Sequence, residues 1–271
     1  MDYKTFEPIK DLSGFVQCYW TLESGSPEIL QKQTIIPDAC MEMIFHYGDL
    51  YREYTENGNS IIQPRCFVIG QLTKPLEIEP TGETSIFSVR FQPGGFFPFF
   101  TVPIKELEDK AVSLEKLFGK DGKEIGEKIL NALSTSERIK LIEAFLLRRL
   151  MTAENIDRLV SSLVEMIFTT NGQLSINEVS KQTNINRRQL ERKFSKAIGL
   201  SPKQLSKTIR LQAALKMLLD QKFTDLTSLS CENEFYDQSH FIKDFKEFTG
   251  FSPKEFYGSQ FEMSSFFYRT E

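Results

Sequence analysis

The stretch Gly199-Leu-Ser-Pro-Lys-Gln-Leu205 returns later in the chain as Gly250-Phe-Ser-Pro-Lys-Glu-Phe256. The two copies are offset by 51 residues, and Phe194 returns as Phe245 at the same offset. A segment that recurs at a fixed spacing indicates a duplicated supersecondary unit. The C-terminal part of the chain is therefore expected to hold two similar units in tandem.

Each copy has the pattern of a helix, a turn and a second helix. Ser175-Ile-Asn-Glu178 is a capping box that opens a short helix, and Asn186 is an N-cap residue for the next one, which Gly199 ends. Between the copies, Pro202 to about Leu219 has no internal helix breaker and predicts one long connecting helix. Two more capping boxes carry proline at the first helical position, Ser201-Pro-Lys-Gln204 and Ser252-Pro-Lys-Glu255.

The charge of the chain is distributed unevenly. The whole protein has a net charge of −4. The segment from Leu174 to Lys216, however, contains ten basic residues and only two acidic ones, Glu178 and Glu191, which gives a net charge of +8. A basic segment inside an acidic protein is typical of a surface that binds nucleic acid.

The outward face of the predicted second helix is basic. On a helical wheel, Arg188, Arg192 and Ser195 point away from the apolar stripe of Leu190 and Phe194. Arginine can form two hydrogen bonds to guanine in the major groove, and the first turns of a recognition helix lie nearest the bases. We interpret Arg188 and Arg192 as DNA contacts rather than a merely solvated face.

The second copy places Ser239, Lys243 and Lys246 on the matching face, with Gln238 at the helix entrance. Acidic residues surround these positions, and the segment from Met217 to Gly258 has a net charge of −4. The second unit is therefore expected to attract phosphates less strongly than the first.

This tandem arrangement resembles the arabinose-operon regulator (AraC) family of transcription factors. The resemblance covers about residues 171–258, and its most specific part runs from Phe235 to Pro253. It implies that both recognition helices approach bases in adjacent major grooves. The expected DNA-binding residues are Arg187, Arg188, Gln189, Glu191, Arg192, Ser195, Lys196, Gln238, Ser239, His240, Ile242, Lys243 and Lys246.

The N-terminal part is expected to be a small β barrel or sandwich followed by helices, because short β-branched and aromatic runs alternate with turn residues. The candidate strands are Gly14–Leu22, Gln33–Pro37, Cys40–Tyr47, Cys66–Ile69, Leu76–Glu79 and Ser85–Phe91. The candidate helices are Ser113–Phe118, Lys123–Leu133, Ser136–Leu150 and Ala153–Phe168. The broad apolar surface of Ser136–Leu150 suits packing between domains or, alternatively, a dimer seam. The fold class is thus α+β with two domains, the second being all-α.

Three motifs resemble a β-rich domain of uncertain role that precedes such tandem units. They are Pro37-Asp-x-Cys40, Ile69-Gly-Gln71 and Val89-Arg-Phe-x-Pro-Gly-Gly95. Arg90 is a natural partner for an acidic ligand, although it can instead pair only with Glu83 or Asp38. The candidate effector-pocket residues are Trp20, Asp38, Glu42, His46 and Arg90.

Several classes of function are disfavoured. The only histidines are His46 and His240, so a histidine-rich metal site and histidine-based catalysis are not expected. The four cysteines are scattered and lack a C-x-x-C motif, which predicts thiols in a reducing compartment. No apolar run is long enough to span a membrane, and the start of the chain lacks a signal-peptide pattern. A cytoplasmic protein with no cofactor, no metal and no enzymatic activity is expected.

The sequence therefore predicts a sequence-specific DNA-binding transcription regulator that responds to an effector. We expect a sensing or dimerisation domain at 1–150, a DNA-binding domain at 151–258 and a tail at 259–271. Double-stranded DNA is the expected partner, with RNA polymerase, a small-molecule effector and a second copy of the chain as further candidates. Two alternatives stay open: a protein-binding adaptor with a decayed DNA face, and a DNA-binding module fused to an unrecognised enzyme.

Overall fold

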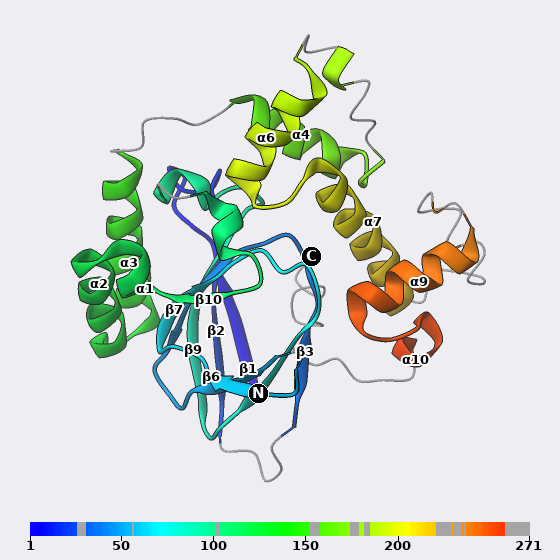
Figure 1. The fold of residues 1–271 in the computed structure, drawn as a ribbon. Coiled ribbons are helices and arrows are strands. Elements are labelled where there is room, and N and C mark those ends of the chain that lie inside the picture. Colours follow the sequence, from blue (N-terminus) through cyan, green and yellow to red (C-terminus); the bar gives the residue numbers. More distant parts are fainter. Residues whose placement is uncertain are drawn as a thin grey trace.

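The computed structural model of the 271-residue chain describes residues 1–25, 31–55, 57–100, 103–151, 158–173, 179–181, 185–220, 229, 235 and 237–257. The predicted capping box at Ser175-Ile-Asn-Glu178, Cys231 and the tail 259–271 lie outside the described residues. In the view of Figure 1, the β-sheets have one group of helices at their left and the C-terminal helices at their upper right.

The N-terminal part contains two antiparallel sheets. The larger sheet has the strand order β1-β2-β9-β4-β7-β10, and the smaller has the order β3-β8-β5-β6. The strands of the larger sheet are β1 (Asp2–Phe6), β2 (Val16–Ser24), β4 (Glu42–His46), β7 (Cys66–Ile69), β9 (Thr84–Phe91) and β10 (Ala111–Ser113). Those of the smaller sheet are β3 (Gln33–Ile35), β5 (Tyr51–Tyr54), β6 (Ser60–Ile62) and β8 (Leu76–Pro80).

Side chains of the larger sheet alternate between two environments, as the period of a β-strand requires. In β9, Phe87 and Val89 belong to the main hydrophobic core, whereas Ile86 packs with Trp20 and Tyr51 in a second, smaller core. One face of the larger sheet therefore packs against helices, and the other face packs against the smaller sheet.

Short helices cover the first of these faces. They are η1 (Phe97–Phe99), η2 (Ile104–Leu107), α1 (Leu114–Phe118), α2 (Lys120–Asn131) and α3 (Thr135–Leu150). In α3, Ile142, Phe145 and Leu146 are buried in the same core as the strands. We expected this apolar face to pack between domains or to form a dimer seam. That expectation is wrong for the buried residues of the face, because they pack against the sheet of the N-terminal domain itself.

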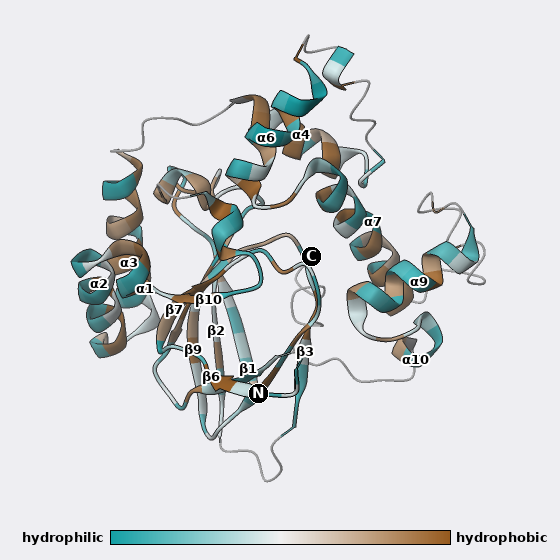
Figure 2. Ribbon diagram, viewed as in Figure 1, coloured by the Kyte–Doolittle hydropathy of each residue, from teal (hydrophilic) through white to brown (hydrophobic). Residues whose placement is uncertain are grey.

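The C-terminal part is helical. Its described helices are α4 (Arg158–Thr169), α6 (Arg187–Ile198), α7 (Pro202–Leu219), α9 (Gln238–Thr249) and α10 (Pro253–Tyr257). Figure 2 shows hydrophilic residues along much of α6 and hydrophobic residues on α4 beside it. No helix among the described residues is long and apolar enough to cross a membrane.

Two separate hydrophobic cores hold these helices. The first joins Val160, Leu163 and Ile167 of α4 to Leu190 and Phe194 of α6. The second joins residues of α7, α9 and α10, among them Leu211, Leu215, Phe241, Phe245 and Phe256. Each repeat copy therefore has its own core, and α7 spans both.

The predicted fold class is confirmed, and the differences lie in particular elements. All six predicted strands occur with boundaries shifted by at most a few residues. The sequence patterns missed β1, β5, β6 and β10, which are short or partly polar. Ser60–Ile62 is exposed at every position, so it has no buried face for a pattern to reveal.

We predict that Phe87→Ala lowers the free energy of unfolding by about 3–5 kcal/mol, because truncation of a buried aromatic ring leaves a cavity. The Phe87 ring is fully buried and lies 5.9 Å from the Phe45 ring, centroid to centroid. Urea unfolding followed by circular dichroism measures the change. Leu133→Ala is the control, because Leu133 is 96% exposed and its truncation should cost less than about 0.5 kcal/mol. Equal effects of the two substitutions would contradict the core described above.

Candidate nucleic-acid interface and effector pocket

The first candidate recognition helix is α6, and local hydrogen bonds fix its two ends. The Asn186 side chain accepts a hydrogen bond from the Gln189 backbone N–H at 2.9 Å, which confirms the predicted N-cap. Gly199 ends the helix in the left-handed conformation with φ 87°, which a residue without a Cβ adopts at least cost. Sequence alone therefore determines where this helix starts and stops.

The outer face of α6 is open to solvent. Arg188 and Arg192 are exposed, and Arg187 forms an ion pair with Glu191 at 2.9 Å one turn away. Leu190 and Phe194 are fully buried on the opposite face. The structure thus presents the arginines where a DNA groove can reach them.

The second candidate recognition helix is α9, which is capped by the side chain of Asp237 and ended by Gly250 at φ 84°. Its acidic residues are partly engaged by the connecting helix. Lys207 of α7 lies 3.0 Å from Asp244 and 3.1 Å from Glu247. Burial tends to lower the pKa of Lys207, but the hydrogen bonds and charges of these two carboxylates outweigh burial and raise it. Three acidic residues near α9 therefore serve as a cap or as partners of Lys207.

The structure places the expected DNA-binding residues on the surfaces of these two helices. Ten are exposed, namely Arg187, Arg188, Gln189, Arg192, Lys196, Gln238, Ser239, His240, Lys243 and Lys246. Three are half-buried, namely Glu191, Ser195 and Ile242.

A cavity of about 70 Å³ lies between the two sheets of the N-terminal domain. Four of the five candidate effector residues line it, and the fifth, Arg90, contacts two of those four. Sequence reasoning missed the rest of the wall, which comes from strands on both sheets and from three connections. The lining residues are Trp20, Ile35, Asp38, Cys40, Glu42, Ile44, His46, Tyr51, Gln63, Phe67, Ile69, Leu72, Leu76, Ile78 and Ile86.

Arg90 is held by a buried polar network at one end of this cavity. Its Nη1 donates to Glu42 Oε1 at 2.6 Å, its Nε donates to Gln17 Oε1 at 3.1 Å, and its Nη2 donates to Asp38 Oδ2. Ser88 Oγ donates to the other oxygen of Glu42 at 3.1 Å. Burial raises the pKa of Glu42, and the adjacent guanidinium counteracts that rise. Of the two interpretations of Arg90, the one observed is pairing with carboxylates of the protein, Asp38 among them.

His46 is the second polar residue on the cavity wall. Its ring stacks on Tyr51 and Phe67, with centroid distances of 5.4 Å and 5.6 Å. Burial lowers the pKa of His46 to about 4, a shift that the nearby Gln63 side chain reduces and the Arg65 charge increases. The imidazole is therefore neutral near pH 7 and offers one donor and one acceptor.

The N-terminal domain contacts both helix-turn-helix units. Ile36 is buried in the core of the second unit, and Ala39 is buried in the core of the first. The carbonyl oxygen of Pro37 accepts a hydrogen bond from Gln212 Nε2 of α7. These contacts all come from the connection between β3 and β4, which sequence reasoning did not connect with the DNA-binding domain.

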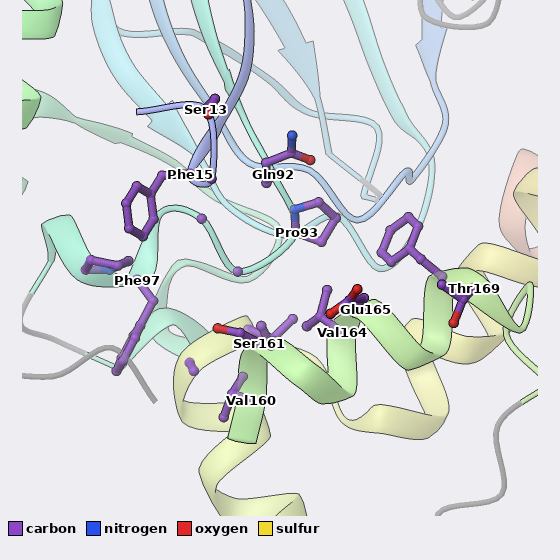
Figure 3. Close-up of a pocket in the computed structure, with 17 residues that line it drawn as sticks. Ser13, Phe15, Gln92, Pro93, Phe97, Val160, Ser161, Val164, Glu165 and Thr169 are labelled. Carbon is purple, nitrogen blue, oxygen red and sulfur yellow. The ribbon is translucent and has the colours of Figure 1, made fainter. Parts of the chain in front are cut away.

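The turn after β9 makes another contact. A Cβ placed on Gly94 would lie 2.5 Å from Cδ1 of Ile198, at the end of α6. Next to this contact, a cleft of about 350 Å³ separates the turn from α4. Figure 3 shows Gln92 and Pro93 on one side of the cleft and Val164, Glu165 and Thr169 on the other. The Pro-Gly-Gly motif is therefore an interdomain contact.

The paired helical units and the exposed basic face of α6 define a DNA-binding protein of the helix-turn-helix class. Residues 179–259 match a family described as a helix-turn-helix domain, and residues 4–113 match a domain of unknown function, DUF6597. The chain joins this N-terminal domain to an AraC-type helix-turn-helix domain, and it is a DNA-binding transcription regulator.

Solved structures with a similar arrangement share little sequence with the chain. ToxT from Vibrio cholerae is 11% identical, covers 89% of this chain and 98% of its own, and has a TM-score of 0.48. ToxT with a bound unsaturated fatty acid is 14% identical over 86% of this chain and 96% of its own, with a TM-score of 0.41. The regulator CdpR from Pseudomonas aeruginosa is 14% identical over 66% of this chain and 46% of its own, with a TM-score of 0.34. No curated relative matches the chain.

We predict that His46 makes the protein less stable as pH falls from about 6.5 to about 4. Because the pKa of His46 is lowered from 6.5 to about 4 on folding, the unfolded chain binds this proton first. The contribution is roughly 1.4 kcal/mol per pH unit within that window. His46→Phe preserves stacking on Tyr51 and Phe67 and should remove this part of the slope. Urea unfolding of both proteins between pH 7 and pH 4.5 measures it, and identical slopes would show that His46 does not contribute.

Proposed function

We propose that this regulator inserts α6 and α9 into adjacent major grooves of duplex DNA, and that an effector bound to the N-terminal domain modulates this binding. The proposed domains are 1–150 for sensing and 151–258 for DNA. The exposed basic face of α6 supports the proposal most directly. It lies on a helix whose opposite face is fully buried, so the unit can dock without rearranging its core.

The two arginines of α6 are proposed to read bases. Arg188 and Arg192 are one helical turn apart, so both side chains can enter the same groove. Arginine hydrogen-bonds to guanine O6 and N7 with two donors, which no other base accepts in the same geometry. Glu191 is bonded to Arg187, which reduces its repulsion of the DNA backbone. We therefore assign most of the sequence preference to this helix.

The second unit is proposed to add affinity with less specificity. Lys243 and Lys246 are exposed on α9, and they suit contacts with phosphates. The ion pairs of Lys207 with Asp244 and Glu247 offset part of the negative charge that the sequence predicts for this surface. Two unequal contacts by one chain favour an asymmetric DNA site.

We predict that Arg192→Ala weakens binding to the preferred duplex by about 1–3 kcal/mol and relaxes sequence preference at one base pair. The preferred duplex is found first by selection from a random pool, and affinities are then measured by fluorescence anisotropy at several salt concentrations. Lys140→Ala is the matched control, because Lys140 is an exposed basic residue on α3 of the other domain. Weak, salt-insensitive binding that is equal in all three proteins would refute the DNA-reading role and favour the adaptor alternative.

We predict a smaller and less specific loss for Lys243→Ala. A phosphate contact weakens binding to all duplexes alike, and its removal should lower the slope of log K against log salt by about 0.9. The same anisotropy titrations on preferred and scrambled duplexes measure this. A loss confined to the preferred duplex would mean instead that Lys243 reads a base.

A further inference from the structure

The connection between β3 and β4 separates the N-terminal cavity from the DNA-binding domain. Ile35, Asp38 and Cys40 line the cavity, whereas Ile36 and Ala39 are buried in the cores of the two helix-turn-helix units. Side chains of one short segment thus alternate between the two regions. A displacement of this segment by the contents of the cavity would therefore change the packing of both units.

The segment is anchored from both sides. Arg90 binds the Asp38 carboxylate, and Gln71 Nε2 donates to the carbonyl oxygen of Ala39 at 3.0 Å. Ala39 has a φ of 65°, which is uncommon for a residue with a Cβ. The backbone is therefore held in a conformation that costs free energy, and the surrounding contacts maintain it. All three motifs of the N-terminal domain contribute to these contacts or to the Gly94 contact beside them.

The size of the cavity limits what it accepts without movement. At about 70 Å³ it is larger than the roughly 10–15 Å³ that one water needs, and smaller than the roughly 150 Å³ of a cavity that holds benzene. Strands of the two sheets form most of its wall. The connection between β3 and β4 is one of three connections that complete the wall, and its Ile36 and Ala39 are buried in the cores of the helix-turn-helix units, so a ligand that displaced it would reach those units.

The chemistry of the wall favours an uncharged ligand. Most lining residues are aliphatic or aromatic, and the charged end carries two carboxylates against one guanidinium. An anion would lie beside Asp38 and Glu42 and compete with both for Arg90. A cation would have to replace Arg90 in contacts that are already made. An uncharged molecule avoids both costs.

His46 supplies the polar contact for such a molecule. The residue is 2% exposed, and among the described residues the Gln63 side chain lies close enough to affect its pKa, but neither ring nitrogen has a hydrogen bond of good geometry. A buried imidazole of this kind gains from a ligand hydroxyl or amide group. The hydroxyl can donate to one nitrogen or accept from the other.

We propose that the cavity between the sheets binds a small, uncharged, mainly apolar molecule with a hydroxyl or amide group facing His46, and that the segment 35–40 transmits its presence to both helix-turn-helix units. The transmission to the helix-turn-helix units rests on the proposed DNA-binding function, whereas the ligand site in the cavity does not.

Three probes with the same branched skeleton test the ligand class: isobutanol, isobutyrate and isobutylammonium. Trp20 is the only tryptophan of the chain and lines the cavity, so its emission reports occupancy directly. We expect isobutanol to give a saturable change with a dissociation constant in the millimolar range, and the two ions to give none at the same concentrations. Isobutanol should bind His46→Phe about fivefold more weakly, because one hydrogen bond is lost.

Two results would overturn the assignment. Isobutyrate or isobutylammonium binding as tightly as isobutanol would refute the uncharged class, and the absence of a saturable change with all three probes on the full-length wild-type protein would refute the site. Both results are measured on the wild-type protein, so neither depends on whether a variant folds.

The link to DNA is tested in the same samples. As isobutanol is added, we expect the dissociation constant for the preferred duplex to change at least threefold at saturation in the wild type, and His46→Phe to need about fivefold more isobutanol for the same change. Probe binding without a change in DNA affinity would overturn the transmission through segment 35–40. Probe binding by a protein that binds no DNA would instead refute the proposed function and leave the ligand site standing.

Discussion

The buried ion pairs of Arg90 impose the strongest constraint on the N-terminal domain. Arg90 lies on β9 directly opposite Glu42 of β4, so one carboxylate comes from the sheet itself. The second carboxylate, Asp38, comes from the connection before β4. A buried guanidinium without its partners costs several kcal/mol, as an order of magnitude. The connection must therefore stay close to the sheet, and this requirement positions Ile36 and Ala39 against the DNA-binding helices.

The contacts between the domains leave the exposed basic face of α6 uncovered. Gly94 touches Ile198 at the last residue of α6, and Ile104 lies against Gly199 just beyond it. Arg188, near the other end of the same helix, is exposed. The N-terminal domain thus contacts α6 at its C-terminal end, whereas the first turns of a recognition helix are the part that lies nearest the bases in helix-turn-helix proteins. The contacts with the domain therefore leave the exposed arginine face of α6 uncovered.

The sequence predicted features that depend on neighbours along the chain. The Asn186 cap, the Ser201 capping box and the end of α6 at Gly199 all follow from local backbone chemistry, and the structure contains each of them. Features that depend on distant segments were harder to predict. The pairing of Glu42 with Arg90 requires the register of two strands more than forty residues apart, which no local pattern contains. The same holds for the bond between Lys207 and Asp244, which changes the apparent acidity of the second unit.

The residues that line the cavity include both local features, which the sequence predicts, and features that depend on distant segments, which it does not. Glu42, Ile44 and His46 share one face of β4 because strand side chains alternate, and the sequence alone is enough to group them. The cavity exists only because the smaller sheet supplies Tyr51 and Ile78 and the connection before β4 closes the remaining side. A wall built from three distant parts of the chain is sensitive to the position of each part. One of those parts, the connection before β4, is also packed into both helix-turn-helix cores, and this shared packing is the basis of the proposed transmission from the cavity.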